Sequence, residues 1–262
     1  MTDPARIRQF FDGVSSDRDA LLDGHEIVRY EQAQRQDLVL RLLEPRAGER
    51  ILDVGCGNGR DLRVYATRRV WATGMDFSMG MLRDTRQKLL ALGHFDGVSL
   101  VQGDATRLPI AACVFDKVAC SEVIEHVPDP LALVKELHRV LKPGGRVVIT
   151  TPNRRSLYGA YRSIEHVWQR AVRTVKRRTA AEQGGHPCDE WKTNRELRGL
   201  AEQAGFVIGR TRNACYVPSH ATYRLSPAVQ RLIVRATARF EAAFNDRLTA
   251  CGYDIGLEAY KR

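Results

Sequence analysis

A glycine-rich stretch directly after a short apolar run is the part of this chain best suited to chemistry. Residues 51–60 read ILDVGCGNGR, so that Gly55, Gly57 and Gly59 alternate with other residues behind the apolar segment. Glycines permit positive φ angles and leave the backbone bare, so that a ligand can lie against it. A strand that turns into a helix at such glycines indicates a cofactor site, with Cys56 inside the turn.

Two acidic residues indicate which cofactor this is. Asp53 stands two residues before Gly55, and Asp76 closes the next apolar run 21 residues after that glycine. A carboxylate at the second position typically binds ribose hydroxyls. The dinucleotide fingerprint needs a third small residue where this chain has Arg60, and Asp53 would repel a diphosphate. A ribose joined to a cation, without phosphate, predicts S-adenosylmethionine, with S-adenosylhomocysteine as its product.

The ends of the following strands complete this prediction. Asp104, after the apolar run at 100–102, can accept a hydrogen bond from an adenine amino group, with Ala105 beside it. Phe77 follows the ribose carboxylate and can cover the adenine face. A fourth strand over 114–121 ends at Cys120 and Ser121, which we expect at the same cofactor pocket.

Methyl transfer from a sulfonium is an in-line displacement, which needs positioning and exclusion of water. A hydroxyl nucleophile must also lose its proton. His126, just past the fourth strand, has the best position for that base, and we assign catalysis to His126 and its neighbour Glu125.

The elements that would position these residues alternate between strands and helices, which predicts an α/β fold. A helix over 131–141 and a strand over 146–150 follow the fourth strand. Thr193 opens a capping-box helix that Gly205 is placed to close. Residues 226–250 predict one long helix, with apolar residues at helical spacing. A last strand covers 253–260.

The motifs LDVGCGNG, GDATRLP, SEVIEHVPDP and LKPGGRVVITTPN occur in this order. They resemble those of class I methyltransferases, in the branch with the ubiquinone- and menaquinone-biosynthesis enzymes, over residues 25–155 and more weakly over 186–210. The resemblance implies a Rossmann-like, mostly parallel seven-stranded sheet with helices on both faces. It also implies an antiparallel last strand beside the fifth, an N-terminal helical flap and two helical insertions.

The same resemblance implies two further roles. Arg35, 20 residues before Gly55, matches an arginine that reaches the cofactor's methionine carboxylate in quinone O-methyltransferases. Glu122, Glu125 and His126 match an E-x-x-E-H set linked to divalent metal, and their spacing would place them on one helical face. Many relatives carry E-H-V without needing metal, so our assignment has no metal and keeps these three residues as the alternative.

We treat the chain as one methyltransferase domain in four parts. Residues 1–47 form the flap, 48–150 the cofactor-binding core, 151–192 a basic helical insertion, and 193–262 the rest of the sheet with the inserted helix 226–250. Residues 154–178 hold eight basic residues against one acid, with apolar residues at helical spacing. This segment would lie on an anionic membrane, cover an acidic substrate, or form a solvated face.

Composition limits the remaining classes. The 262 residues carry a formal charge of +10, six scattered cysteines and no apolar run that could span a bilayer. We therefore expect a cytoplasmic protein, peripheral to the inner face of the membrane if the basic segment binds lipid. Nucleic acid is not an expected partner, because SEVI at 121–124 replaces the Asn/Asp-Pro-Pro-aromatic loop of base methyltransferases.

The sequence thus predicts a methyltransferase for a small amphipathic acceptor that is quinone-like, lipid-like or a secondary metabolite. O-methylation is favoured over methylation at carbon or nitrogen. The alternatives are an NAD-dependent oxidoreductase and a catalytically silent S-adenosylmethionine-binding module.

Overall fold

The computed structural model describes residues 25–94, 96–156, 190–216, 225–244 and 252–262. Residues 1–24 of the expected flap and residues 157–178 of the basic segment lie outside these ranges. Among the described residues, we find no helix with the length and apolar character that crossing a bilayer requires.

Seven strands form one sheet in the order β3-β2-β1-β4-β5-β7-β6. Their bounds are β1 Arg50–Val54, β2 Trp71–Asp76, β3 Val98–Gln102, β4 Phe115–Ser121, β5 Leu141–Pro152, β6 Phe206–Ala214 and β7 Asp254–Lys261. β7 runs antiparallel to both β5 and β6, and the pairs from β3 to β5 are parallel. The expected fold class and the antiparallel last strand beside the fifth are confirmed.

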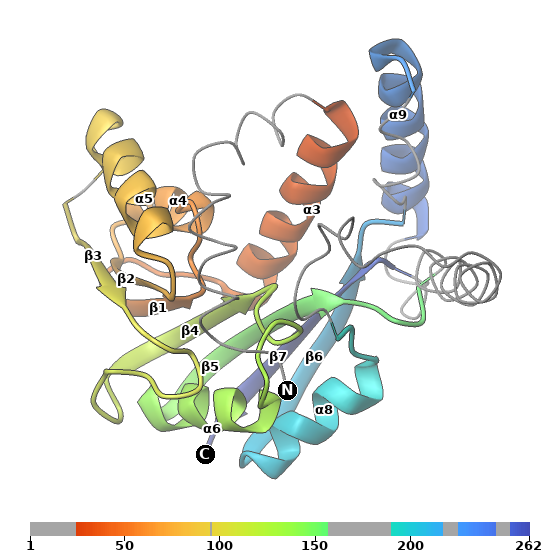
Figure 1. The fold of residues 1–262 in the computed structure, drawn as a ribbon. Coiled ribbons are helices and arrows are strands. Elements are labelled where there is room, and N and C mark those ends of the chain that lie inside the picture. Colours follow the sequence, from red (N-terminus) through yellow and green to blue (C-terminus); the bar gives the residue numbers. More distant parts are fainter. Residues whose placement is uncertain (1–24, 95, 157–189, 217–224, 245–251) are drawn as a thin grey trace, which may run out of the picture.

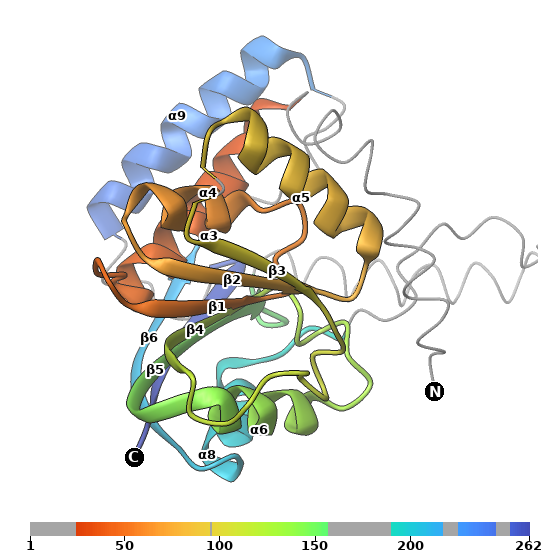
Figure 2. The same cartoon turned by 90° about the vertical axis from the view of Figure 1, so that its left-hand side faces the viewer.

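Helices cover both faces of the sheet (Figures 1 and 2). The described helices are α3 Glu26–Leu43, α4 Arg60–Thr67, α5 Met79–Ala91, α6 Pro130–Val140, α8 Asn194–Gln203 and α9 Pro227–Phe244. Helices α3, α4 and α5 lie on one face, and α6 and α8 lie on the other. Helix α9 lies beside α3, at the side of the molecule away from α4 and α5 in Figure 1.

Local sequence explains where several of these helices begin. Thr193 and Glu196 form the expected capping box at the start of α8. The carboxylate of Asp129 accepts a hydrogen bond from the backbone amide of Ala132 at the start of α6, and Pro130 occupies the first turn, where no amide donor is needed. Such caps fix the ends of the loops that precede these helices. The loop before α6 ends at Asp129, in the site described below.

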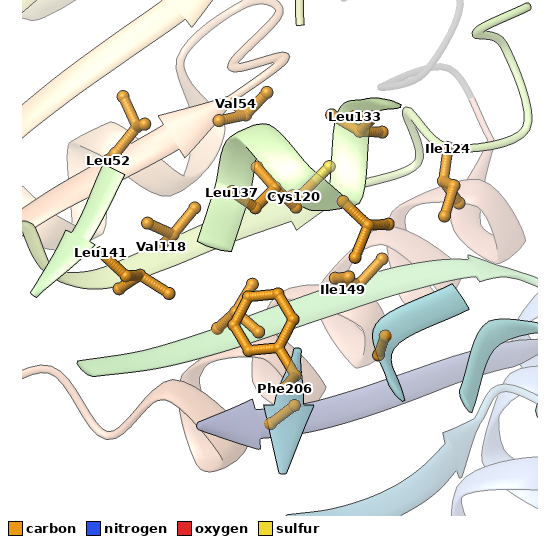
Figure 3. Packing of buried hydrophobic residues seen from close by; sticks show 14 of the residues in the cluster. Leu52, Val54, Val118, Cys120, Ile124, Leu133, Leu137, Leu141, Ile149 and Phe206 are labelled. Carbon is orange, nitrogen blue, oxygen red and sulfur yellow. The ribbon is translucent and has the colours of Figure 1, made fainter. Parts of the chain in front are cut away.

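Two apolar cores hold the layers together. The larger lies between the sheet and helices α6 and α8, and it includes Val118, Leu137 and Phe206 (Figure 3). On the other face, Leu38, Leu42 and Leu43 of α3 are buried against the sheet. Burying a leucine side chain stabilises the fold by roughly 1.5–3 kcal/mol, so these contacts anchor α3 against the sheet.

One strand is longer than the sequence predicts, and the end of one predicted helix is not described. β5 begins at Leu141, because Leu141 pairs with Phe115 before the Lys-Pro-Gly-Gly turn and a register shift leads to the pair Lys117–Arg146. The long C-terminal helix is described over Pro227–Phe244, and residues 245–250 of the expected helix lie outside the described ranges.

Candidate functional site

A cavity of about 400 Å³ lies at the carboxyl ends of β1, β2 and β4. The strand order reverses between β1 and β4, and open α/β sheets bind ligands at such a switch point. The residues that line it are Gln32, Arg35, Gln36, Asp53, Gly55, Cys56, Gly57, Asn58, Arg60, Asp61, Met75, Asp76, Phe77, Met81, Gly103, Asp104, Ala105, Thr106, Ser121, Glu122, Val123, His126, Val127, Pro128 and Asp129.

The glycine turn between β1 and α4 forms the floor of this cavity. Gly55 and Gly57 have φ angles of +73° and +52°, in the left-handed region that side chains disfavour. The amides of Gly55 and Cys56 both donate to the carbonyl of Met75 at the end of β2, at 2.7 and 3.0 Å. A Cβ on Gly55 would lie 2.2 Å from Cγ2 of Val123, whereas one on Gly57 would meet no atom within 4 Å. Backbone is therefore exposed to a ligand at Gly57.

Asp76 is held in place at the end of β2. Its Oδ2 accepts from the backbone amide of Gly57 at 2.8 Å, and its Oδ1 accepts from that of Ser78 at 2.9 Å. A carboxylate oxygen has more than one lone pair, so both oxygens keep acceptor capacity. The carboxylate is thus oriented in advance for two hydroxyl donors.

Asp104, Ala105 and Phe77 form the rim on the β3 side. Oδ1 of Asp104 accepts from the amide and the hydroxyl of Thr106, at 2.8 and 2.7 Å. Gln102 donates to the carbonyl of Phe77 at 3.2 Å, which links the loops after β2 and β3. All three residues that the sequence assigns to the adenine line this cavity, and their contact with the cofactor remains a prediction.

The lining carries more negative than positive charge. Six of its side chains are carboxylic acids, against two arginines and one histidine: Asp53, Asp61, Asp76, Asp104, Glu122 and Asp129, against Arg35, Arg60 and His126. Burial raises the pKa of Asp53 well above its usual range, and the charges of Asp61 and Asp76 raise it further. A cationic ligand would relieve this repulsion, and an anionic one would increase it.

Arg35 connects helix α3 to three carboxylates. Its guanidinium lies 3.3 Å from Glu31, 3.3 Å from Glu122 and 3.2 Å from Asp254, all measured between nitrogen and oxygen. Burial raises the pKa of Asp254 to about 6 and that of Glu122 well above its usual range, because one cation cannot balance three buried carboxylates. Arg35 lines the cavity, as predicted, and in this state it pairs with protein carboxylates.

His126 reaches the cavity and Glu125 does not. Glu125 is buried, and its Oε2 accepts from the hydroxyl of Thr151 at 3.1 Å. Its Oε1 lies 3.8 Å from Nε2 of His126. Glu125, which we assigned to catalysis with His126, thus lies behind His126 and outside the cavity lining, where the hydroxyl of Thr151 on β5 satisfies its buried carboxylate.

The metal alternative does not match the geometry. Residues 122–126 form a bend followed by a turn at 124–126, with no helix, and Glu122 has a φ angle of +57°. Glu122 interacts with Arg35 and Glu125 with Thr151. Within the described ranges, no three His, Cys, Asp or Glu side chains gather in a way that could hold a metal ion.

Cys120 also departs from expectation. Its side chain packs in the core beneath the sheet, and only its neighbour Ser121 lines the cavity, because successive residues of a strand point to opposite faces. The hydroxyl of Ser121 lies 2.8 Å from that of Thr150, and this hydrogen bond joins the C-terminal end of β4 to β5.

Sequence reasoning missed Gln36 and Asp61. The side-chain amide of Gln36 on α3 donates to Oδ1 of Asp61 on α4 at 2.9 Å, which closes one wall of the cavity. Asp61 had a signal in the sequence, because it lies in the first helical turn after the glycines, where an acid is favoured. Gln36 had none beyond its spacing of one residue from Arg35.

Known proteins resemble this chain in sequence and in fold. A methyltransferase-domain family matches residues 27–209. A ubiquinone biosynthesis O-methyltransferase of Alkalilimnicola ehrlichii is 32% identical over 200 residues, which cover 73% of this chain and 74% of that protein. A demethylmenaquinone methyltransferase of Staphylococcus aureus is 30% identical over 220 residues, which cover 79% and 88%.

Solved structures agree with the fold at lower identity. Magnesium protoporphyrin IX methyltransferase from Synechocystis, solved with bound S-adenosylhomocysteine, has a TM-score of 0.66 at 17% identity and covers 99% of this chain and 100% of its own. A methyltransferase from Thermotoga maritima has a TM-score of 0.64 at 18% identity and covers 98% and 100%.

Proposed function

The chain belongs to the methyltransferase-domain family as a class I S-adenosylmethionine-dependent enzyme, and we propose that it methylates a hydroxyl group on a small, quinone-like acceptor. The observation that supports this proposal is the pair of relatives, a ubiquinone biosynthesis O-methyltransferase and a demethylmenaquinone methyltransferase, each aligned over more than two thirds of this chain. Both names favour a quinone-like acceptor, and the first favours transfer to oxygen. The sequence left an NAD-dependent oxidoreductase and a catalytically silent module as alternatives. Membership in the methyltransferase family argues against both.

The residues of the cavity fit the cofactor. We assign Asp76 to the ribose hydroxyls, the turn from Gly55 to Gly57 to the backbone contact, and Asp53 to the cationic end. Asp104, Ala105 and Phe77 are assigned to the adenine, and Ser121 and Cys56 to the pocket walls. The acid excess of the lining suits a sulfonium and an ammonium, and the volume lies in the usual range for ligand sites.

Arg35 is assigned to the cofactor's carboxylate. This assignment requires its guanidinium to exchange part of its contact with Glu31, Glu122 and Asp254 for the ligand. The exchange is feasible because the cluster has more negative than positive charge, and the carboxyls that lose the cation can bind protons instead.

The bound cofactor supplies an electrophilic methyl group on a sulfonium. The protein's part is to hold the acceptor hydroxyl in line, exclude water and take the proton. We assign the role of proton acceptor to the imidazole of His126, which lines the cavity. The carboxylate of Glu125 lies 3.8 Å behind it and balances the positive charge that the imidazole gains. Cys120 and the side chain of Glu125 have no direct contact with the acceptor in this mechanism.

The membrane prediction for residues 154–178 concerns positions that are almost all outside the described ranges, and it remains a prediction. It agrees with the proposed acceptor class, because a quinone with a prenyl tail resides in the bilayer. An enzyme bound at the membrane surface would reach the head group of such an acceptor while its prenyl tail stays in the bilayer.

An acceptor screen tests the proposal. The purified chain is incubated with S-adenosylmethionine and with short-tailed catechols, hydroxyquinones, amines and carbon acids, and the formation of S-adenosylhomocysteine and of each methylated product is followed by mass spectrometry. We expect turnover on hydroxyl-bearing quinones or catechols. Turnover confined to amines, or to ring carbon, would contradict O-methylation while leaving the methyltransferase activity intact.

A further inference from the structure

Helix α9 presents apolar side chains to solvent and polar ones to the protein. Leu232 is 68% exposed, Phe240 43% and Val229 42%, although Phe240 also contacts the ring of Tyr216 edge-on at 6.1 Å. Among the side chains of the same helix that the structure describes, Gln230, Thr237 and Glu241 are buried, at 2%, 6% and 5% exposure. This arrangement reverses that of a surface helix in a water-soluble domain.

The buried polar face explains why α9 keeps this orientation. The carboxylate of Glu241 accepts hydrogen bonds from the hydroxyl of Tyr30 on α3 and from the amide of Tyr216 at 3.0 Å. Thr237 donates to the carbonyl of Ile233 at 2.9 Å, and Gln230 donates to that of Leu225, also at 2.9 Å. The bonds of Thr237 and Gln230 are local to the helix and its N-terminal end, and they satisfy these two side chains in their buried positions. A rotation of the helix about its axis would break the contacts of Glu241 with Tyr30 and Tyr216 and leave a buried carboxylate unpaired, at a cost of about 1–3 kcal/mol, so the apolar stripe is held outward.

Positive charge runs beside the apolar stripe. Arg231, Arg235 and Arg239 are exposed and recur every four residues, which places them in one row along the helix. The only acid of α9 is Glu241, and it is buried. Near the start of α3, Glu26 lies 3.7 Å from Arg231, and within the described part of the chain Arg235 and Arg239 have no carboxylate that offsets their charge.

We propose that the outer face of α9, made of Val229, Leu232 and Phe240 with Arg231, Arg235 and Arg239, docks on an anionic lipid surface. Apolar side chains beside a row of arginines match the layered chemistry of such a surface, where acyl chains lie beneath phosphate headgroups.

Charge argues against two other candidate occupants of this face, because each would bring positive charge against the arginine row. A second copy of the chain would use the same patch in a twofold contact, which would bring the arginine rows of the two copies together. Residues 154–178 of the chain itself carry eight basic residues against one acid, and they would repel the row as well. Anionic lipid is the occupant that complements both features of the face.

Docking through α9 would place the membrane close to the cavity. Helix α3 lies between them: its Tyr30 contacts Glu241 of α9, while its Gln32, Arg35 and Gln36 line the cavity. Figure 1 shows α9 beside α3, on the side of the molecule away from α4 and α5. The inference itself is independent of the acceptor proposed above, because lipid binding needs neither cofactor nor acceptor.

Vesicle flotation of the full chain tests this surface. Vesicles of phosphatidylcholine, with and without phosphatidylglycerol, are compared at low and at physiological salt. We expect binding only to the anionic vesicles and weaker binding at higher salt. Arg235→Glu with Arg239→Glu should lower the partition coefficient by roughly a thousandfold at low salt, because each reversal removes one attractive charge and adds a repulsive one. Val229→Gln with Leu232→Gln should lower it at both salt concentrations.

A matched control changes the same charge elsewhere. Arg195→Glu with Arg198→Glu alters two exposed arginines of α8, on the opposite face of the sheet, and should leave binding close to that of the wild type. Melting temperatures show whether each variant is folded. Wild-type protein that fails to float with anionic vesicles would overturn the inference.

Two further results would also overturn it. One is unchanged binding in both α9 variants while Arg173→Glu with Lys176→Glu and Arg177→Glu abolishes it, which would assign the lipid contact to the basic segment alone. The other is a dimer in sedimentation velocity that dissociates with Val229→Gln and Leu232→Gln, which would make a second copy the occupant.

Discussion

At the scale of single residues, the site depends on acids that the fold keeps close together. Asp53 is buried near Asp61 and Asp76, and its pKa is raised first by burial and then by these neighbours. On the α3 side, Arg35 balances only part of the charge of Glu122 and Asp254. A cationic ligand or bound protons would reduce the repulsion in both clusters of acids, the one around Asp53 and the one around Arg35. Ligand binding and pH must therefore be coupled at this site.

Asp76→Ala should weaken the binding of S-adenosylmethionine by about tenfold or more, because charge-assisted hydrogen bonds to two ribose hydroxyls are lost. Asp76→Asn, which keeps the shape but only one carbonyl oxygen, should lose less. Calorimetry measures both affinities, and thermal melting of the free proteins checks the fold. An unchanged dissociation constant in Asp76→Ala would refute the assignment of this residue to the ribose.

His126→Ala should lower the turnover number more than the affinity for the cofactor, because the imidazole takes a proton only during the reaction. Turnover should also survive EDTA, since the described residues offer no three-ligand metal set. Full activity of His126→Ala would eliminate it as the base. Activity lost with EDTA and restored by magnesium or zinc would instead make Glu122 and His126 candidate ligands.

Arg35→Ala should destabilise the protein more at high pH than at low pH. Burial raises the pKa of Asp254 to about 6, so the stability that its neutral form provides is complete below about pH 4 and is lost as pH rises through 6. Without the guanidinium the carboxylates stand uncompensated, at a cost of about 3 kcal/mol at pH 8, and protonation reduces that cost in acid.

Denaturant unfolding at about pH 5.5 and about pH 8 measures this difference for Arg35→Ala. Arg29→Ala, on the same helix but half-exposed and in a surface ion pair with Glu26, serves as the control and should change little at either pH. An equal loss at both pH values would contradict the charge balance described for Arg35.

At the scale of elements, the turn from β1 into α4 packs on the loop that follows β4. Gly55 faces Val123 so closely that any Cβ would overlap it, and the amides of Gly55 and Cys56 share one carbonyl of β2. The shape of the cavity floor therefore depends on three elements together. Gly57 has the same kind of backbone conformation but open space where a Cβ would project.

Gly55→Ala should destabilise the fold by more than Gly57→Ala, because both substitutions strain the backbone but only the first collides with Val123. Strain alone costs roughly 1–2 kcal/mol, which is the expected loss for Gly57→Ala. The double variant Gly55→Ala with Val123→Ala should recover part of the larger loss. Equal losses for the two glycines, measured by denaturant unfolding, would show that the contact with Val123 carries no strain.

At the scale of the whole molecule, the sheet joins a cofactor site, a cluster of charge on α3 and an outward apolar helix. Asp254 begins β7, far along the chain from Arg35, and the antiparallel pairing of β7 with β5 brings it to the cavity edge. The same edge supports α3, and α3 supports α9 through Tyr30 and Glu241. The two proposed functions thus lie on opposite sides of one helix.

Loss of lipid binding should impair activity only on acceptors with long tails. We expect Arg173→Glu with Lys176→Glu and Arg177→Glu, and separately Arg235→Glu with Arg239→Glu, to slow methylation of a prenylated acceptor presented in anionic vesicles. Methylation of a short, soluble analogue should proceed at the wild-type rate. Equal slowing on both acceptors would mean that these residues act on catalysis and not on access to the membrane.

The sequence by itself determined the parts of this protein that depend on neighbours in the chain. The glycine turn, Asp76 at the end of β2, the capping box at Thr193 and the order of strands and helices all follow from local spacing. The carboxyl ends of parallel strands meet at one edge of the sheet, so Asp53, Asp76 and Asp104 could be assigned to one site from the sequence alone. The cofactor and the fold class follow from the same pattern.

Only the tertiary structure decided which side chains face the cavity and which do not. Glu125 turned away from it because residues 122–126 form a bend and a turn with no helix, and Cys120 did so because it alternates with Ser121 along β4. The carboxylates around Arg35 include one from β7, and the buried face of α9 is polar because Tyr30 and Tyr216 satisfy Glu241. These contacts join residues distant in sequence, and periodicity within one element carries no information about partners on another.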